Sequence, residues 1–370
     1  MRPRRKSIPV RVGNVVIGGA AEIVVQSMCK SDTRDVKATL NEIGRLKDAN
    51  CKIVRVAVPT KEAAEAMIEI KKGSPLPIIA DIHYDAPLAL LALAAGVDGL
   101  RLNPGNIKDP EKVKEITRQA KAREISIRIG VNAGSLPGRA KEGAGVRPPT
   151  EEVVEAMVKA ALGHIHILES LDFNLIKVSM KASDPPTMIA ANRAIADKIA
   201  YPLHLGVTES GPPRTGSVKS AVGIGVLLEE GIGDTIRVSL AGDSVDEVEV
   251  AYGIINALAE KQTGPNLIAC PMCGRLEIDM LPMVAEVEKA LKKIKRPINV
   301  SVMGCVVNGP GEGQHADIGI AGGKNKGILF KHGKIVGTFP EKELVPALLR
   351  ELDIIAAEDA AAAAAGTPVA

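Results

Sequence analysis

The sequence predicts an α/β protein built as a (β/α)₈ TIM barrel that is followed by a smaller α+β domain. Eight apolar stretches typical of strands alternate with eight amphipathic stretches, and this alternation stops near residue 262. Aromatic residues make up only 2% of the chain, so the cores must consist of Val, Ile, Leu and Ala, which suits parallel strands covered by helices. An open doubly wound sheet remains the alternative, because the number of strands does not show closure.

The barrel elements follow in order after a short hairpin expected around Gly13 and Asn14. Strands are expected at residues 23–28, 53–58, 77–81, 99–103, 125–131, 175–179, 203–207 and 235–239. Helices are expected at residues 35–49, 61–72, 86–95, 110–123, 150–171, 185–199, 219–230 and 245–261. Asp109, Thr150 and Asp184 stand where N-capping residues are preferred, which supports three of the helix starts.

The second domain is expected at residues 263–356, so that the barrel domain spans residues 1–262. Its elements are predicted as strands 266–269, 298–303 and 316–321, helices 279–293 and 341–355, and a hairpin across 330–334. Residues 357–370 contain a run of six alanines and are expected to form a disordered or frayed tail.

Charge and composition exclude several classes of protein. The net charge is +3, from 47 basic and 44 acidic residues, which does not predict a nucleic-acid-binding protein. No stretch approaches 18 consecutive apolar residues, so no membrane span is expected. The basic first residues are not followed by an apolar signal segment, and the five cysteines form no disulfide pattern. We therefore expect a cytoplasmic protein.

Three cysteines in the second domain predict a metal site. Cys270 and Cys273 form a C-x2-C pair after a predicted strand, and Cys305 opens a glycine-rich loop after another. The fourth ligand is open from the residues alone. His315 would complete a structural zinc site, whereas Glu312 would be a hard, replaceable ligand on one iron of a cubane cluster.

Polar side chains are concentrated near the ends of the predicted barrel strands. They are Arg55, Asp81, His83, Arg101, Asn103, Arg128, Asn132, Lys177, Ser179, Lys181, His204, Thr208, Glu209, Arg237 and Ser239. A single strand Arg often pairs with a buried carboxylate, but this set holds more Arg and Lys than Asp and Glu. It therefore predicts a basic mouth for a phosphorylated ligand. Glu209 would serve in proton transfer there or would pair with one of the cations.

Other candidates carry less chemistry. His164 and His166 are two residues apart on a predicted helix and would not face each other, which disfavours a metal pair. Cys29 and Cys51 are interpreted as small buried apolar residues rather than as ligands. No glycine motif has the strand, turn and helix context of a nicotinamide site.

The motifs together resemble those of one known family. Cys-Pro-Met-Cys-Gly-Arg from residue 270 and Gly-Cys-Val-Val-Asn-Gly-Pro-Gly-Glu from residue 304 follow a barrel with Ala-Asp-Ile-His, Arg-Leu-Asn-Pro-Gly-Asn and His-Leu-Gly-Val-Thr-Glu. This combination closely resembles bacterial 4-hydroxy-3-methylbut-2-enyl diphosphate synthases, the IspG/GcpE family, in their two-domain form. The resemblance implies an oxidoreductase that reductively opens 2-C-methyl-D-erythritol 2,4-cyclodiphosphate in the non-mevalonate (MEP) pathway of isoprenoid biosynthesis.

The same resemblance implies roles for particular residues. A [4Fe-4S] cluster would be held by Cys270, Cys273, Cys305 and Glu312, and Glu209 would be the catalytic acid. The implied diphosphate ligands are Arg55, Arg101, Arg128, Lys177, Lys181 and His204, and the further substrate-binding candidates from the same strand ends are Asn103, Asn132, Ser179 and Ser239. Flavodoxin or ferredoxin would supply electrons, and a head-to-tail homodimer would place the active site between two chains.

Two other functions stay open at the level of sequence. One is a redox-inert phosphate-binding barrel with a structural zinc knuckle. The other is a sugar-phosphate aldolase with Lys177 as its Schiff-base lysine, which would leave the three cysteines of the second domain unexplained.

Overall fold

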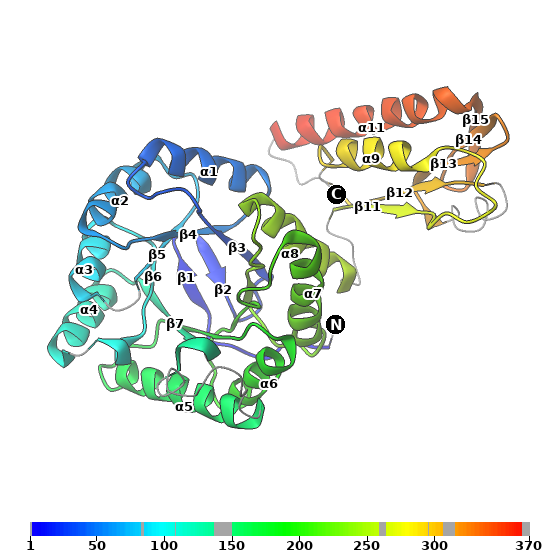
Figure 1. Cartoon of the computed structure of the whole chain (residues 1–370). Coiled ribbons are helices and arrows are strands. Elements are labelled where there is room, and N and C mark those ends of the chain that lie inside the picture. The colour runs from blue at the N-terminus through cyan, green and yellow to red at the C-terminus, as the bar shows by residue number, and fades with distance from the viewer. Residues whose placement is uncertain are drawn as a thin grey trace. The chain divides into compact units, whose positions relative to one another are not determined.

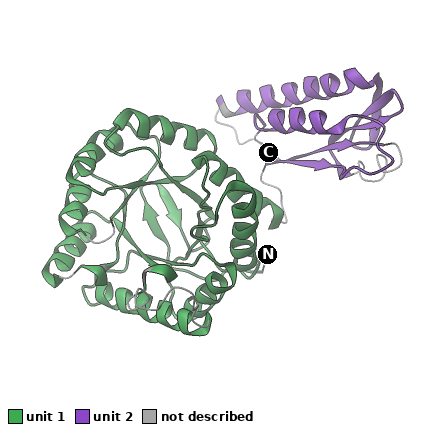
Figure 2. Cartoon of the chain, in the orientation of Figure 1, with its two compact units in different colours: residues 1–258 green, residues 259–370 purple. Residues whose placement is uncertain are grey.

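The fold is described from a computed structural model, in which the chain forms two compact units, Met1–Leu258 and Ala259–Ala370 (Figure 2). The described residues are 2–82, 85–107, 109–136, 150–258, 264–294, 296–305 and 315–364. The expected boundary at residues 262 and 263 lies outside the described residues and stays a prediction.

The first unit is a closed barrel of eight parallel strands (Figure 1). These are β3 (Val24–Met28), β4 (Ile53–Ala57), β5 (Ile78–Asp81), β6 (Gly99–Arg101), β7 (Ser126–Asn132), β8 (Ile176–Lys181), β9 (His204–Leu205) and β10 (Thr235–Ile236). The strands pair in the order β8-β7-β6-β5-β4-β3-β10-β9, and a parallel bridge between Val178 and Leu203 joins β8 to β9. The ring is therefore complete, which confirms the (β/α)₈ prediction over the open sheet.

Helices surround the barrel in the order that the sequence predicts. They are α1 (Val36–Asp48), α2 (Lys61–Gly73), α3 (Ala86–Ala94), α4 (Pro110–Ala122), α5 (Thr150–Glu169), α6 (Pro185–Ala196), α7 (Pro213–Glu229) and α8 (Ser244–Leu258), with short 3₁₀ turns η1 (Pro104–Asn106) and η2 (Ala133–Ser135). Asp109 and Asp184 accept amide hydrogen bonds from the first turns of α4 and α6, as expected of N-caps. Helix α7 begins earlier than predicted because proline is well suited to a first helical turn.

A hairpin closes the amino-terminal end of the barrel. Its strands are β1 (Val10–Val12) and β2 (Val15–Ile17), which pair antiparallel and lie across the barrel centre in Figure 1. Their side chains pack with Val24, Ile53 and Ile79 in one apolar cluster. Because this end is filled by apolar residues, we expect ligand chemistry at the carboxyl ends of the strands.

Three strands are shorter than predicted, because regular pairing stops where the site loops begin. Strands β6, β9 and β10 end at Arg101, Leu205 and Ile236. Single backbone hydrogen bonds continue past these ends, such as the bond from the amide of Arg237 to the carbonyl of Leu205 (3.0 Å). The polar residues at the mouth therefore still have a fixed backbone.

The second unit is a five-stranded sheet with two helices packed on one face. Its elements are β11 (Pro265–Ala269), α9 (Met280–Leu291), β12 (Ile298–Met303), β13 (Ile318–Gly323), β14 (Lys326–Lys331), β15 (Lys334–Pro340) and α11 (Glu341–Ala364). Strands β11, β12 and β13 are parallel, and β14 and β15 continue the sheet antiparallel. The core contains Val300 and Ile320 of the sheet, Val287 of α9 and Leu348 of α11.

The expected frayed tail is wrong for residues 357–364, because α11 continues through them. Asp359 in this stretch is 1% exposed, and its carboxylate accepts a hydrogen bond from Nε of Arg296 (2.5 Å). Alanine also has the highest helix propensity, so the alanine run extends the helix once Asp359 is anchored. Residues 365–370 lie outside the described residues.

Candidate active site

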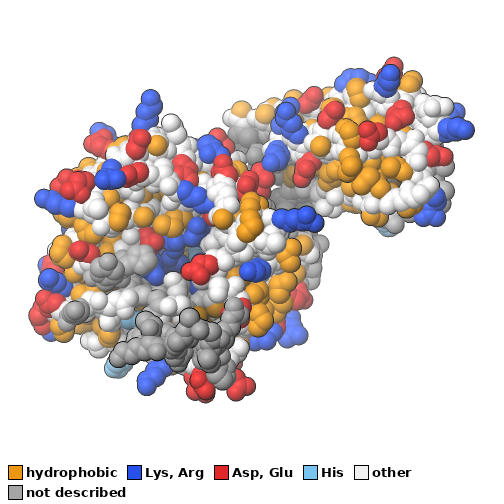
Figure 3. All heavy atoms as spheres, in the orientation of Figure 1, with side chains coloured by type: hydrophobic (Ala, Val, Ile, Leu, Met, Phe, Trp, Pro, Cys, Tyr) orange, Lys and Arg blue, Asp and Glu red, His pale blue; other side chains and the backbone are white. Residues whose placement is uncertain are grey.

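Register places three cations side by side inside the barrel. Arg101 of β6 is paired with Arg128 of β7, which is paired with Lys177 of β8. Paired residues of neighbouring strands face the same side of a sheet, so all three side chains point inward. They are at most 6% exposed. Figure 3 shows Lys and Arg side chains in the hollow at the centre of the visible face of the barrel.

The cations outnumber the carboxylates that neutralise them. Asp81 of β5 is 3.3 Å from Nε of Arg55 and 3.6 Å from Nη1 of Arg101. Glu247 of α8 is the second buried carboxylate of this site. Within the described part of the barrel, these two acids face six buried or half-buried cations: Arg55, Arg101, Arg128, Lys177, Lys181 and Arg237. Buried cations without countercharges are costly, so the interior favours an anionic ligand.

The excess of cations changes their protonation. Burial, followed by the nearby charge of Arg128, lowers the pKa of Lys177 to about 7. The same causes hold the pKa of Lys181 well below its ordinary value. Burial and the neighbouring Arg55 and Arg101 also lower the pKa of Arg128. Its Nε and Nη1 have no hydrogen-bond partner among the described residues, which leaves both donors available to a ligand.

His204 of β9 adds a neutral group to this interior. The side chain is fully buried, and neither ring nitrogen has a hydrogen-bond partner in the described part of the chain. Burial and then the charge of Arg128 lower the pKa of His204 well below its ordinary value, which favours neutral imidazole. Ser179 of β8 donates to the carbonyl of Ile129 (3.3 Å), so its hydroxyl can accept but not donate further bonds.

Asn103 braces the wall of the site. Its Nδ2 donates to the carbonyl of Gly130 (2.7 Å), and the amide of Gly130 donates to Oδ1 of Asn103 (2.8 Å). A Cβ on Gly130 would lie 2.9 Å from Nε of Arg101. Glycine therefore makes room for Arg101 at this point, and the amide of Asn103 is engaged with the protein backbone.

A pocket of about 310 Å³ lies beside Asn103 and Asn132, between the loops after β6 and β7 and helix α5. His164 of α5 lines it, and Nδ1 of His164 accepts a hydrogen bond from the amide of Gly105 (2.8 Å). Asn132, at the end of β7, is half-buried and lies at the carboxyl end of the barrel like the other site residues.

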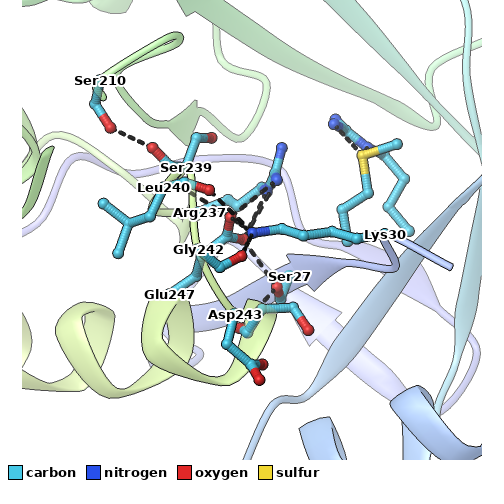
Figure 4. Close-up of polar contacts among 12 residues, drawn as sticks. Ser27, Lys30, Ser210, Arg237, Ser239, Leu240, Gly242, Asp243 and Glu247 are labelled. Atoms are coloured by element: carbon cyan, nitrogen blue, oxygen red, sulfur yellow. Dashed lines mark hydrogen bonds and ion pairs between the residues drawn. The ribbon is translucent and has the colours of Figure 1, made fainter. Parts of the chain in front are cut away.

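Glu209 and Ser239 lie in the loops that follow β9 and β10. Glu209 is exposed and adopts a φ of 51°, in the left-handed region that non-glycine residues rarely adopt. The hydroxyl of Ser210 donates to the carbonyl of Ser239, which ties the two loops together (Figure 4). Both predicted residues are therefore presented at the carboxyl ends of their strands.

Three residues of the mouth are not among the substrate-binding residues predicted from the sequence. Arg237 belongs to the predicted strand-end set only, and Lys30 and Glu247 belong to no predicted set. Glu247 lies 3.0 Å from Nζ of Lys30 and 3.3 Å from Nη2 of Arg237 (Figure 4). Helical spacing could have revealed Glu247, since it shares a buried face with Ala251 and Ile254 of α8.

In the second unit, two of the predicted metal ligands follow neighbouring parallel strands. Cys270 comes directly after β11, and Cys305 comes two residues after the end of β12. Ala269 and Val302 are register partners, so both thiols lie at the same edge of the sheet. Cysteine thiolates at such strand ends suit zinc or an iron–sulfur cluster.

Cys273 and Glu312 complete the predicted ligand set. Cys273 is exposed, and a hydrogen bond from the backbone amide of Arg275 lowers the pKa of its thiol, which favours the thiolate. Glu312 lies outside the described residues. Among the residues that are described, no three His, Cys, Asp or Glu side chains lie close enough together to hold a metal ion.

The other two cysteines are buried in the barrel unit, as predicted. Cys29 is 7% exposed and Cys51 is 2% exposed, and both belong to the main apolar core. Burial raises the pKa of both thiols, that of Cys51 to about 11. Neither would supply a thiolate at neutral pH, so both act as small apolar residues.

Fold and site together define a TIM-barrel protein with a cation-rich interior and a separate thiol-bearing α+β unit. The chain belongs to the GcpE family. The model for the GcpE TIM-barrel domain matches residues 7–252, and that for the GcpE protein C-terminal domain matches residues 266–354. The resemblance noted from the motifs is thereby confirmed.

Similar proteins cover nearly the whole chain. A protein of Dehalococcoides mccartyi strain BAV1 is 55% identical over 95% of this chain and 99% of its own length. One of Geobacter sulfurreducens is 53% identical over 96% of this chain and 99% of its own length. Both are named 4-hydroxy-3-methylbut-2-en-1-yl diphosphate synthase (flavodoxin). Among solved structures, dihydropteroate synthase of Vibrio fischeri aligns with 69% of this chain and 100% of its own at 12% identity, with a TM-score of 0.49.

Proposed function

We propose that this protein is a 4-hydroxy-3-methylbut-2-enyl diphosphate synthase. It would reductively open 2-C-methyl-D-erythritol 2,4-cyclodiphosphate to the allylic diphosphate in the MEP pathway of isoprenoid biosynthesis. One structural observation carries the proposal: the barrel gathers six cations around two carboxylates, in a chain whose second unit bears three thiols near strand ends. The names of relatives more than 50% identical over almost the whole chain support it.

The barrel would bind the diphosphate through its excess cations. Arg128, Lys181 and Arg237 would contact phosphate oxygens. Asp81 would hold Arg55 and Arg101 in position through its ion pairs with both. Lys177, His204, Asn132, Ser179 and Ser239 are the remaining predicted substrate-binding residues, and Asn103 would act on the ligand through the backbone that it braces.

The second unit would hold a [4Fe-4S] cluster through Cys270, Cys273 and Cys305, with Glu312 as the fourth ligand. The thiol chemistry and the common sheet edge of Cys270 and Cys305 support this assignment. When bound, the cluster would supply the two electrons of the reaction. Glu312, as a carboxylate, would be more readily replaced than a fourth thiolate.

Glu209 would be the catalytic acid. The reaction consumes two electrons and a proton while the ring C–O bond breaks and an oxygen leaves as water. Glu209 is exposed on the loop after β9, where an acid can reach a ligand in the barrel mouth. The cations of the barrel would stabilise the diphosphate throughout the reaction.

Partners and location follow from the same proposal. Flavodoxin, which stands in the printed names of the relatives, or ferredoxin would deliver the electrons. A head-to-tail homodimer would bring the cluster of one chain to the barrel of another.

None of the described helices is long and apolar enough to cross a membrane. We place the protein in the cytoplasm, because the cluster thiols need a reducing compartment.

Metal and acid-labile sulfide analysis of protein prepared without oxygen tests the proposal. We expect iron and sulfide in the ratio of a cubane cluster, and an electron paramagnetic resonance signal of the reduced protein that changes when the cyclic diphosphate is added. Stoichiometric zinc without sulfide would instead support the alternative, a redox-inert phosphate-binding barrel with a zinc knuckle.

Two variants separate the roles of the units. Glu312→Gln should retain a cluster while turnover falls sharply, and full activity of this variant would remove Glu312 from the mechanism. Arg101→Ala should weaken substrate binding more than it lowers cluster content. Equal loss of both in Arg101→Ala would indicate misfolding rather than a binding role.

A further inference from the structure

Glu247 is an acid on a helix whose side chain reaches the strand ends of the barrel. It is 1% exposed. Its carboxylate accepts hydrogen bonds from the hydroxyl of Ser27 (3.1 Å) and the amide of Leu240 (3.0 Å). It also lies 3.0 Å from Nζ of Lys30. These contacts come from β3, from the loop after β3 and from the loop after β10, so the position of the carboxylate is fixed from several sides.

Arg237 meets this carboxylate with one edge of its guanidinium. Nε lies 3.4 Å from one carboxylate oxygen, and Nη2 lies 3.3 Å from the same oxygen and 3.4 Å from the other. Figure 4 shows a guanidinium nitrogen of Arg237 that points away from Glu247. The contact therefore orients the planar group and leaves a donor edge for another partner.

Arg237 lies among the other cationic residues of the barrel interior. Its positive charge contributes to lowering the pKa of Arg128, Lys181 and His204, so Arg237 lies close to all three. A Cβ at Gly206 would lie 2.9 Å from Nζ of Lys181 and 2.4 Å from the carbonyl oxygen of Arg237. Because residue 206 is a glycine, the backbone that follows β9 can pass between these two cationic residues.

We propose that Glu247 is a positioning residue for substrate binding, which holds Arg237 with its outer donor edge directed at the diphosphate. This inference rests on the proposed function, because it takes the cyclic diphosphate as the ligand. Glu247 does not touch the ligand. It acts through Arg237, whose orientation before binding reduces the conformational entropy lost on binding.

Lys30 has a different task, although it shares the same carboxylate. Its Nζ donates to the carbonyls of Leu240 (2.9 Å) and Gly242 in addition to its contact with Glu247. All three ammonium donors are thereby directed at protein groups. Lys30 clamps the loop after β10, so a Lys30 variant tests whether Glu247 acts by holding this loop rather than by orienting Arg237.

A double-mutant cycle on the full-length protein, loaded with its cluster, tests the inference. The dissociation constant of the cyclic diphosphate is measured by calorimetry, and KM and kcat by turnover, for the wild type, Glu247→Gln, Arg237→Ala and the double variant. We expect each single change to raise the dissociation constant and KM about tenfold with a smaller effect on kcat. The double variant should bind no more weakly than Arg237→Ala alone, because Glu247 acts through Arg237.

Two controls separate positioning from structural support. Asp234→Asn removes another buried carboxylate that pairs with an arginine. Asp234 lies 2.9 Å from Nη2 of Arg4, and this pair is at the amino-terminal end of the barrel, away from the site. It should lower thermal stability without changing the dissociation constant. Lys30→Met should change the dissociation constant less than threefold, on the order of the scatter among surface changes.

The outcomes distinguish this inference from the proposed function. A wild-type protein that fails to bind the cyclic diphosphate overturns the proposed function. A wild type that binds it while Glu247→Gln binds equally well overturns the positioning role alone. Additive losses in the double variant, or a Lys30→Met variant as weak as Glu247→Gln, would assign Glu247 to the loop clamp and also overturn the role.

Discussion

The ammonium group of Lys177 donates a hydrogen bond to the hydroxyl of Ser126 deep inside the barrel. The same hydroxyl donates to the carbonyl of Arg11 in the hairpin that closes the amino-terminal end (3.0 Å). Lys177 is thus directed toward the closed end, while its register partner Arg128 has donors available to a ligand. With a pKa of about 7, Lys177 is partly neutral near neutral pH, which gives the barrel a cation that a bound anion can recharge.

The binding of the cyclic diphosphate should therefore take up protons. A dianion beside Lys177 and Lys181 favours their charged forms and raises their lowered pKa values. About one pH unit above the pKa of Lys177, the free group is mostly neutral and the bound group mostly charged. We expect uptake on the order of one proton per ligand, and affinity that falls as pH rises further. Calorimetry in buffers with different ionisation enthalpies measures this uptake, and heats that do not depend on the buffer would contradict it.

The substitution Lys177→Met should stabilise the ligand-free protein while weakening substrate binding. The pKa of Lys177 is about 7 in the folded protein against 10.5 for the free group, so the unfolded chain binds its proton more tightly. The resulting cost to stability is fully present below about pH 7 and disappears as pH rises toward 10.5. We expect a melting temperature several degrees above that of the wild type near pH 6.5 and a smaller difference near pH 9.

Lys71→Met provides the matched control for this prediction. Lys71 is partly exposed, and its Nζ lies 2.7 Å from a carboxylate oxygen of Asp98. Loss of this ion pair should reduce the free energy of unfolding by at most about 1 kcal/mol, so the melting temperature should fall only slightly. It should not affect ligand affinity. A Lys177→Met variant that melts below the wild type at both pH values would show that the buried lysine stabilises the free barrel.

Much of the barrel could be predicted from the sequence because strands and helices differ in their apolar periodicity. The inward position of Arg101 and Arg128 could be predicted as well, since charged residues inside apolar strands stand out from their neighbours. Glu247 is harder to select. It lies between Asp246 and Glu249 on a helix, where acids are usually solvated, and its helical spacing with Ala251 and Ile254 is a weaker signal than a charge inside an apolar strand.

The end of the last helix depended on a contact distant in sequence. An alanine run is compatible with a helix or with a frayed terminus, since isolated helix ends are marginally stable. The ion pair of Asp359 with Arg296, 63 residues earlier, stabilises the helical form. Nothing in the local sequence indicates this ion pair. Short strands such as β9 were likewise overpredicted, because apolar residues continue past Leu205 where the paired ladder ends.

The substitution Gly130→Ala should weaken ligand binding through Arg101. The new Cβ would lie 2.9 Å from Nε and 3.2 Å from Nη2 of Arg101, so the guanidinium must move. We expect an affinity for the cyclic diphosphate about tenfold lower, with KM rising more than kcat falls. Gly44→Ala is the control, because nothing lies within 4 Å of a Cβ in that helical position. It should leave affinity unchanged and raise stability slightly, by about 0.5–1 kcal/mol. Wild-type affinity in Gly130→Ala would mean that the exact place of Arg101 does not matter for binding.

Substitution of the thiols should divide the five cysteines into two groups. Cys305 lies beyond the end of β12 at the same sheet edge as Cys270, so Cys305→Ser should lose most of its iron and acid-labile sulfide together with turnover. Cys51→Ser places a hydroxyl in the barrel core, where the thiol is 2% exposed and close to the carbonyl of Ile53 (3.2 Å). This variant should melt at a lower temperature but keep its iron and sulfide, because Cys51 belongs to the barrel core rather than to the ligand set. Iron and sulfide are measured on both proteins after anaerobic reconstitution. Iron and sulfide contents equal to the wild type in Cys305→Ser would remove this thiol from the ligand set. Loss of iron and sulfide in both variants would instead mean that the cluster is lost whenever the whole protein is destabilised.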